Sequence, residues 1–255
     1  MSGKKEGARR PVVVDLAGRG RVGKSAVGDV LAMLALDEGR EPLIADANEN
    51  ATLAGRYPWA SRPPSDDVAD MVAWYTDRLG EAVDKGRSLI LDLGPAAEVV
   101  RRQHGIEFNL PEFCASVGFG YLTVFVAGPA QEDLDYVLGL VRSGIHVSAP
   151  AVLFFNEALV GARKNAALAF DGVGTAPELM PGGELHGAGV RPALLPNLPF
   201  LDLLRCKGLG LRAALDGAAG RDGKPLDPAR RFQAKQGVAD LRARFATLGV
   251  AEVLP

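Results

Sequence analysis

One stretch near the start of the chain constrains its fold more than any other. Residues 18–25 read Gly-Arg-Gly-Arg-Val-Gly-Lys-Ser, which matches the spacing G-x-x-x-x-G-K-S at every position. A short apolar run, residues 12–17, precedes this stretch, and an alanine-rich stretch with helical spacing, residues 25–36, follows it. A phosphate-binding loop needs this order of strand, loop and helix, because its backbone N–H groups surround an anion at the positive end of the helix. We therefore expect phosphate groups to bind here.

The side chains of this loop predict how the phosphates are held. The Lys24 ammonium supplies a point charge to the β- and γ-phosphates, and the Ser25 hydroxyl is a ligand for Mg²⁺. The candidate nucleotide-binding residues are the whole loop and the residue after it: Gly18, Arg19, Gly20, Arg21, Val22, Gly23, Lys24, Ser25 and Ala26.

Two further apolar runs each present a carboxylate. Residues 42–46 end in Asp46, and residues 88–94 contain Asp92 two positions before a glycine. Both runs are typical of buried parallel strands, whose carboxyl ends meet at one edge of a sheet. Asp92 has the position of a Walker B acid, which holds a water of the Mg²⁺ shell. The polar, aperiodic residues 47–52 are expected to form a loop at the same edge.

The remaining pattern predicts a single doubly wound α/β domain, with a mostly parallel sheet and helices on both faces. Apolar runs at residues 121–126 and 151–155 are separated by helical stretches, and residues 191–196 are a candidate edge strand because of their prolines. The domain is expected over residues 11–255, after a basic segment at residues 1–10. Residues 172–189 are predicted to be a mobile loop, residues 217–228 a turn-rich excursion, and residues 228–248 a terminal helix.

Composition narrows the class of protein. The net charge is −2, from 29 basic and 31 acidic residues, so any DNA contact needs a local patch. No apolar run approaches the roughly 20 residues that cross a bilayer, and the first residues lack the apolar core of a secretory signal. Cys114 and Cys206 are expected to be unpaired, and the three histidines show no metal-ligand spacing. We expect a cytoplasmic protein without stable membrane insertion.

The motifs also resemble those of a known family. Residues 18–25 are similar to the deviant Walker A motif of the ParA/MinD superfamily of ATPases, usually written K-G-G-x-G-K-[ST], with Arg19 at the place of the signature lysine. Residues 46–55 and 152–157 resemble segments of TraL-like ATPases, which are conjugal-transfer proteins carried by plasmids. The first similarity covers the nucleotide-binding core, and the second rests on short blocks in the right order and on a similar overall length.

The resemblance implies a metal site and its ligands. Lys24 would contact the β- and γ-phosphates of ATP or ADP, and Ser25 would bind Mg²⁺ directly. Asp46 and Asp92 would hold waters of the Mg²⁺ shell.

The resemblance also implies a base site and a dimer. Asn156 would meet the adenine edge, and Pro196 is assigned to the same nucleotide site. Asn156 and Glu157 lack the N-K-x-D pattern of guanine-binding proteins, which favours ATP over GTP. In the family, the signature lysine reaches across a dimer that encloses the nucleotides. Arg19 keeps the charge but has a planar fork of donors in place of an ammonium.

One departure from the family bears on catalysis. The family pattern D-x-D places a second acid near the attacking water, and this chain has Asn48 there. An amide can orient a water by hydrogen bonding but cannot accept its proton as a carboxylate does. Positioning and charge stabilisation supply most of the acceleration in phosphoryl transfer, so the expected activity is slow ATP hydrolysis, with Lys24, Arg19, Asp46 and Asn48 as candidate catalytic residues.

Three functions are compatible with these motifs. The preferred one is an ATP-dependent molecular switch that dimerises on ATP binding and recruits a protein of the DNA-transfer or partition machinery. The second is a P-loop small-molecule ligase or kinase, similar to dethiobiotin synthetase, whose second pocket Glu49, Arg56 and His104 would border. The third is a binding module that holds nucleotide without hydrolysing it.

DNA is a further candidate partner. Positive surface could come from the predicted terminal helix and from five basic residues elsewhere in the chain: Arg101, Arg102, Arg205, Lys207 and Arg212. Scattered basic residues are more often a solvated face, and the terminal helix more often packs its apolar stripe on its own domain.

Overall fold

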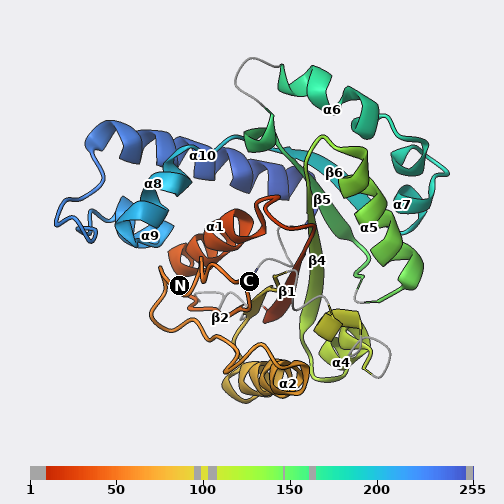
Figure 1. Cartoon of the computed structure of the whole chain (residues 1–255), viewed down its shortest axis with the longest axis horizontal. Coiled ribbons are helices and arrows are strands. Elements are labelled where there is room, and N and C mark those ends of the chain that lie inside the picture. The colour runs from red at the N-terminus through yellow and green to blue at the C-terminus, as the bar shows by residue number, and fades with distance from the viewer. Residues whose placement is uncertain (1–9, 95–98, 103–107, 146, 161–164, 251–254) are drawn as a thin grey trace, which may run out of the picture.

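The fold is built on one parallel sheet of six strands, in the order β2-β3-β1-β4-β5-β6. The computed structural model describes residues 10–94, 99–102, 108–145, 147–160, 165–250 and 255 (Figure 1). The strands are β1 (Val12–Ala17), β2 (Leu43–Asp46), β3 (Leu89–Asp92), β4 (Gly120–Ala127), β5 (Ala151–Asn156) and β6 (Val190–Leu195). This arrangement confirms the predicted doubly wound α/β class.

The strand order determines where a ligand site can form. β1 has β3 on one side and β4 on the other, and both pairings are parallel. The chain therefore first extends the sheet in one direction through β2 and β3 and then continues on the other side of β1. Open α/β sheets bind ligands beyond the carboxyl ends of the strands at such a switch point. The loop at residues 18–25 leaves the carboxyl end of β1 and so lies at this point.

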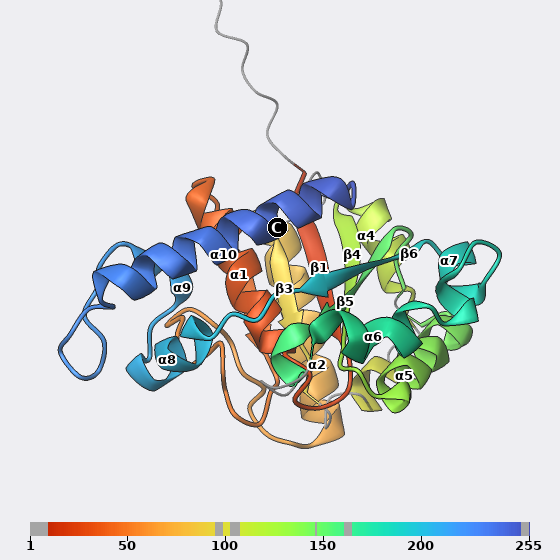
Figure 2. The same cartoon turned by 90° about the horizontal axis from the view of Figure 1, so that it is seen from above.

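Helices cover both faces of the sheet (Figures 1 and 2). One face packs against α1 (Lys24–Asp37), α8 (Phe200–Lys207), α9 (Leu211–Leu215) and α10 (Pro228–Thr247). The other face packs against α2 (Val68–Lys85), α4 (Leu110–Ser116), α5 (Gln131–Ser143), α6 (Ala166–Gly174) and α7 (Glu184–Gly187). Alternate residues of β1 separate the two cores, since Val14 and Leu16 contact the first and Val13 the second.

Burial explains why the strands read as continuous apolar runs. Every residue of β1, β2, β3 and β5 is buried, because helices or loops cover both sides of these strands. β6 lies at the edge of the sheet, as its prolines predicted, and its Arg191 and Pro192 are exposed.

The terminal helix also agrees with the sequence prediction. Asp227 caps the N-terminus of α10 by accepting a hydrogen bond from the Arg230 backbone N–H at 3.0 Å. Its apolar stripe is buried against the domain at Ala234, Val238, Leu241 and Phe245. Phe154 of β5 meets Phe245 edge to face, with ring centroids 5.4 Å apart. The helix is therefore part of the core of this domain.

The prediction of a mobile loop at residues 172–189 is wrong. The end of α6, a short helix η3 (Pro177–Leu179) and α7 occupy this segment. Its Leu179 and Leu185 are buried among apolar residues of α5, β5 and β6. Glycine and proline lie at the ends of these short helices. Tertiary packing, which the local composition does not reveal, stabilises the helices.

The predicted turn-rich excursion after residue 216 is present as a loop that leads into α10, with turns at residues 216–217 and 221–223. Before it, α8 and α9 form from a stretch for which the sequence analysis predicted no element. Their signals were available, since Phe200, Leu201 and Leu204 have helical spacing and Gly208 ends α8 with φ +62°.

Candidate functional site

The loop after β1 has the tight backbone that its glycines predict. Gly18 has φ +151° and Gly23 has φ +106°, conformations that glycine adopts without steric cost. A Cβ at Gly18 would lie 2.4 Å from the Val126 carbonyl oxygen, and one at Gly23 would lie 2.4 Å from Nδ2 of Asn156. Neither position has room for a side chain. The loop therefore lies in close contact with the ends of β4 and β5 at the start of α1.

Lys24 is the first residue of α1 and is almost fully buried, with 5% of its surface exposed. Its Nζ donates hydrogen bonds to the carbonyl oxygens of Gly18 at 2.8 Å and Arg19 at 2.9 Å. These contacts bend the side chain back over its own loop. The ammonium is thus held beside the concave backbone where phosphate oxygens of a nucleotide would lie.

Ser25 and Asp92 meet at the base of the loop. The Ser25 hydroxyl donates to Oδ2 of Asp92 at 2.5 Å, and Nδ2 of Asn48 lies 3.4 Å from the same hydroxyl oxygen. Asp92 ends β3 and is paired in register with Asp46 of β2 and Leu16 of β1. The parallel register therefore brings together residues that are 67 positions apart in the chain.

Asp92 is a buried acid with an unusual affinity for protons. Burial raises its pKa to about 6; the Ser25 hydrogen bond opposes this shift, and the charge of Asp46 adds to it. Its other oxygen, Oδ1, is buried and has no hydrogen-bond partner among the described residues. A buried carboxylate oxygen without a donor is a costly arrangement, which a cation would relieve.

These residues fit a magnesium ion that is bound together with a nucleotide. In the described part of the chain, no group of three or more His, Cys, Asp or Glu side chains is placed to hold a metal by itself. Mg²⁺ in nucleotide sites usually has one or two carboxylates, phosphate oxygens and several waters as its ligands. Ser25 and Asp92 supply the protein share of such a site.

The Asp46 carboxylate stabilises the loop after β2. Its Oδ1 accepts a hydrogen bond from the Asn48 N–H at 3.0 Å, and its Oδ2 accepts from the N–H groups of Leu53 at 2.9 Å and Ala54 at 2.8 Å. These bonds fold the loop after β2 around the carboxylate. The role of Asp46 toward waters of a Mg²⁺ shell stays a prediction.

Asn156, at the end of β5, contacts the phosphate-binding loop. Its Nδ2 donates to the Val22 carbonyl oxygen at 2.7 Å, and its Oδ1 accepts from the Ala158 N–H at 3.0 Å. Pro196 follows β6, whose last residue, Leu195, pairs with Asn156. Both residues thus lie at the carboxyl edge of the sheet. A contact of Asn156 with adenine stays a prediction, and the amide would have to share or exchange its present partners.

Arg19 points away from its own loop toward α5. Its guanidinium lies 3.3 Å from Oδ1 of Asp133, which belongs to the first turn of α5, and 48% of the side chain is exposed. The other oxygen of Asp133 accepts from the Gly128 N–H at 2.8 Å. Arg19 is therefore tethered at the surface of the site by a long ion pair.

A cleft of about 800 Å³ opens over the loop. The phosphate-binding loop contributes Arg21, Lys24 and Ser25 to its lining, and the loop after β2 contributes Asn48 and Glu49. Helix α8 supplies two further side chains, Asp202 and Arg205. Asp202 carries no sequence signal for this cleft, and the sequence around Arg205 predicts only basic surface, because nothing local relates α8 to a loop 180 residues earlier.

Two of the residues proposed for a second substrate pocket, Glu49 and Arg56, do not line one cavity together. Glu49 lines the cleft. Arg56 is buried behind it, where its guanidinium pairs with Asp29 of α1, and His104 lies outside the described residues. The Asp29 carboxylate also accepts from the Tyr57 hydroxyl and, at 3.1 Å, from the Leu211 N–H. Asp29 therefore ties α1 to the loop after β2, through Arg56 and Tyr57, and to α9, through Leu211. Because Arg56 is buried in this contact, the prediction that it borders a pocket is wrong.

Three of the basic residues considered for DNA binding, Arg101, Lys207 and Arg212, are paired with acidic residues. Arg101 is 2% exposed and pairs with Asp15 in the middle of β1, so its assignment to positive surface is wrong. Lys207 pairs with Asp222 at 2.6 Å, and Arg212 bonds to Asp37 and, at 2.8 Å, to Asp216. Acidic partners therefore reduce the local positive charge on which phosphate binding depends.

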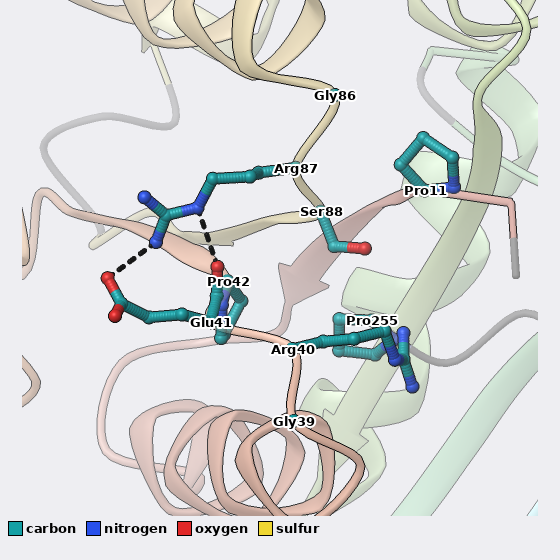
Figure 3. A pocket seen from close by; sticks show the side chains of 9 residues that line it. All are labelled: Pro11, Gly39, Arg40, Glu41, Pro42, Gly86, Arg87, Ser88 and Pro255. Carbon is teal, nitrogen blue, oxygen red and sulfur yellow. Dashed lines mark hydrogen bonds and ion pairs between the residues drawn. The ribbon is translucent and has the colours of Figure 1, made fainter. Parts of the chain in front are cut away.

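A second pocket, of about 420 Å³, lies at the opposite edge of the sheet (Figure 3). Pro11, Pro42 and Ser88 line it at the starts of β1, β2 and β3. Arg87 points across the pocket and donates to the backbone carbonyl and the carboxylate of Glu41, both at 2.7 Å (Figure 3). Its charge thus already has a partner, whereas the cleft at the other edge is lined by Lys24 and Ser25, and Ser25 contacts the buried acid Asp92.

Within the part of the chain that the structure describes, every helix is too short or too polar to cross a bilayer.

Comparison with known proteins adds a general likeness of fold. No protein-family model and no curated protein sequence match this chain. The signal recognition particle receptor FtsY from Elizabethkingia anophelis matches with 15% identity and a TM-score of 0.41, over 63% of this chain and 54% of FtsY. The match thus spans about half the length of that receptor.

Two other solved structures match over most of their lengths. A putative plasmid partition protein from Borrelia burgdorferi, bound to AMPPNP, has 11% identity and a TM-score of 0.44, over 92% of this chain and 99% of that one. The MinD cell division protein of Aquifex aeolicus has 16% identity and a TM-score of 0.42, over 89% and 95%. At such low identities and TM-scores, these likenesses carry no conclusion about ligand or function.

Proposed function

We propose that this protein is an ATP- and Mg²⁺-dependent molecular switch of the ParA/MinD type, with slow ATP hydrolysis and dimerisation on ATP binding. The observation on which the proposal rests is the pairing of Ser25 with the buried Asp92 beneath a complete G-x-x-x-x-G-K-S loop, at the floor of a cleft of about 800 Å³. The Asp92 oxygen that lacks a donor among the described residues supports a cation at this point.

Each residue of the cleft floor has a specific task in this proposal. Backbone N–H groups of the loop and the Lys24 ammonium bind the phosphates, and Ser25 and Asp92 hold the metal and its waters. Bound Mg²⁺ would neutralise negative charge on the β- and γ-phosphates. Asp46 keeps the loop after β2 folded, so that Asn48 stays beside Ser25 at 3.4 Å.

Slow hydrolysis follows from the chemistry of Asn48. Its amide can orient a water next to the terminal phosphate but cannot accept the proton of that water. A slow reaction suits a switch, because the ATP-bound state then lasts long enough for a partner to bind. The functional output is association, and the resemblance of residues 46–55 and 152–157 to TraL-like ATPases favours plasmid conjugation or partitioning as its setting.

Arg19 is the residue that the proposal assigns to the dimer. Its side chain is half exposed, and its ion pair with Asp133 is long, at 3.3 Å; on release of Arg19, Asp133 keeps its hydrogen bond from the Gly128 N–H. A second copy facing the cleft would offer nucleotide phosphates, for which a guanidinium fork is well suited. In a monomeric ligase or kinase, such a residue would have no task.

Binding and dimerisation provide the main test. Wild-type protein is expected to bind a non-hydrolysable ATP analogue with Mg²⁺, and Lys24→Ala to weaken that binding roughly 10- to 150-fold, the equivalent of about 1.5–3 kcal/mol for a charged hydrogen bond. In sedimentation velocity, the ATP analogue but not ADP should shift wild type to a dimer, and Arg19→Ala should abolish the shift. Arg142→Ala is the matched control, because Arg142 is also an exposed arginine in an ion pair, with Glu184.

Hydrolysis separates the switch from its alternatives. Single-turnover measurements should give slow cleavage of ATP, and Asn48→Asp should accelerate it. Bound ATP that stays intact for hours would favour the non-hydrolysing module. A brisk basal rate that Lys24→Ala barely lowers would refute the proposed site.

A further inference from the structure

Helix α8 brings two charged side chains to the cleft that no motif assigns to it. Asp202 and Arg205 lie three positions apart on this helix and line the cleft together with Arg21, Lys24 and Ser25. Their side chains lie 3.8 Å apart and are mostly exposed, at 86% for Asp202 and 64% for Arg205. The contact is too long and too solvated to hold the guanidinium firmly.

The helix beneath these side chains is fixed. Phe200, Leu201 and Leu204 are buried in the same core as α1. Arg56 donates a hydrogen bond to the Leu201 carbonyl oxygen at 3.3 Å from its place beside Asp29, so α8 is also tied to α1 and to the loop after β2. Arg205 therefore combines a rigid attachment point with a head group that can reorient.

The lining of the cleft indicates which part of a nucleotide Arg205 would face. Ser25 and Asn48, the residues on the side of the metal, contribute to this lining, together with Glu49, Asn50 and Thr52 of the loop after β2. Asn156 and Pro196, the candidates for the base, are not among the residues that line it. The cleft thus joins the phosphate-binding loop to α8 on the side of Ser25 and Asn48, and not on the side of the candidates for the base.

We propose that Arg205 binds the terminal phosphate of a nucleotide held in the same chain, and that Asp202 competes with this phosphate for the guanidinium. The inference rests on the proposed nucleotide site and adds to it a residue outside the motifs. A guanidinium exchanges a weak carboxylate contact for a bidentate contact with phosphate, which is the stronger of the two. Helix α8 would then sense whether the third phosphate is present.

The test compares affinities for a non-hydrolysable ATP analogue and for ADP, both with Mg²⁺. Calorimetry on the full chain at low ionic strength keeps electrostatic effects large, and protein concentrations below dimerisation restrict the measurement to one chain. Arg205→Gln is expected to weaken binding of the ATP analogue by about threefold to tenfold, in the range of a solvated charge-assisted contact. Its effect on ADP should stay below about twofold, because the terminal phosphate is missing.

Two further variants sharpen the result. Asp202→Asn should strengthen binding of the ATP analogue, because it removes the competing carboxylate. Arg230→Gln should change neither affinity; Arg230 is a matched control, since it is an exposed arginine paired with an aspartate three positions earlier, on α10. All three side chains are at least half exposed, so melting temperatures should stay close to that of wild type.

Several outcomes would overturn the inference. Unchanged affinity of Arg205→Gln for the ATP analogue, an equal loss for ADP, or weaker binding by Asp202→Asn would each refute it. The proposed nucleotide site is judged separately by Lys24→Ala. If that variant loses binding while Arg205→Gln behaves as wild type, the site stands and only the role of Arg205 fails. If wild type binds neither nucleotide, both proposals fail.

Discussion

Replacing Asp92 by asparagine should make the nucleotide-free protein more stable at pH 8, although Asp92 lies at the centre of the proposed site. The acid is completely buried at the end of β3, and burial raises its pKa to about 6. In the unfolded chain, the pKa returns to about 3.8. The folded protein thus binds the Asp92 proton more tightly than the unfolded chain does, and ionisation of this group opposes folding.

The size of the effect follows from the shift. A difference of roughly two pKa units, at 1.36 kcal/mol per unit, amounts to about 3 kcal/mol. This cost is absent below about pH 3.8 and complete above about pH 6, because stability falls with pH wherever the folded state binds more protons. Asparagine has nearly the same shape as the protonated acid. The expected gain is therefore up to about 3 kcal/mol at pH 8 and roughly half of that at pH 5.

Urea unfolding in the presence of a chelator measures this difference. Wild type and Asp92→Asn are compared at pH 5 and pH 8, with Asp84→Asn on the exposed side of α2 as the control. With Mg²⁺ and an ATP analogue, the advantage of the variant should shrink, because the bound metal and nucleotide stabilise wild type more than a variant that lacks the Asp92 carboxylate. A stability difference that does not change between pH 5 and pH 8, or a variant less stable than wild type at pH 8, would refute the reasoning.

Two other substitutions test the architecture around the cleft. Asp29→Ala leaves Arg56 buried without its carboxylate and should destabilise the protein by about 3–5 kcal/mol in chemical denaturation, whereas Arg212→Ala, at an exposed ion pair, should have little effect; similar losses for the two variants would contradict this. Gly23→Ala would place a Cβ 2.4 Å from Nδ2 of Asn156 on a residue with φ +106°. The substitution should therefore lower the free energy of unfolding by about 1–3 kcal/mol in thermal denaturation and weaken nucleotide binding. Adding Asn156→Ala should restore only part of this loss, since the backbone strain remains; wild-type stability of Gly23→Ala alone would show that the loop has room to adjust.

The fold class and the floor of the candidate site can be predicted from the amino-acid sequence. Apolar runs with a carboxylate at the end predicted buried parallel strands, and the parallel sheet then brings Asp46 and Asp92 to one edge beside Lys24 and Ser25. These predictions succeeded because they depend on local periodicity and on a loop whose backbone geometry requires glycine at fixed positions. The helical pattern and the Asp227 cap likewise placed the terminal helix.

Which residues share a surface depends on how the helices and strands pack. The residues around Arg101 in the sequence do not distinguish it from an exposed arginine. In the structure it is buried and pairs with Asp15, which lies 86 positions earlier in the sequence. The sequence around Arg205 indicates only surface charge, and the packing of α8 into the same core as α1 brings this residue to the cleft. Asn156 binds the loop carbonyl of Val22, 134 positions away. Such contacts depend on how separate helices and strands pack. The sequence shows the local preference of each segment for helix, strand or loop, but it does not show which distant segments will lie side by side in the folded protein.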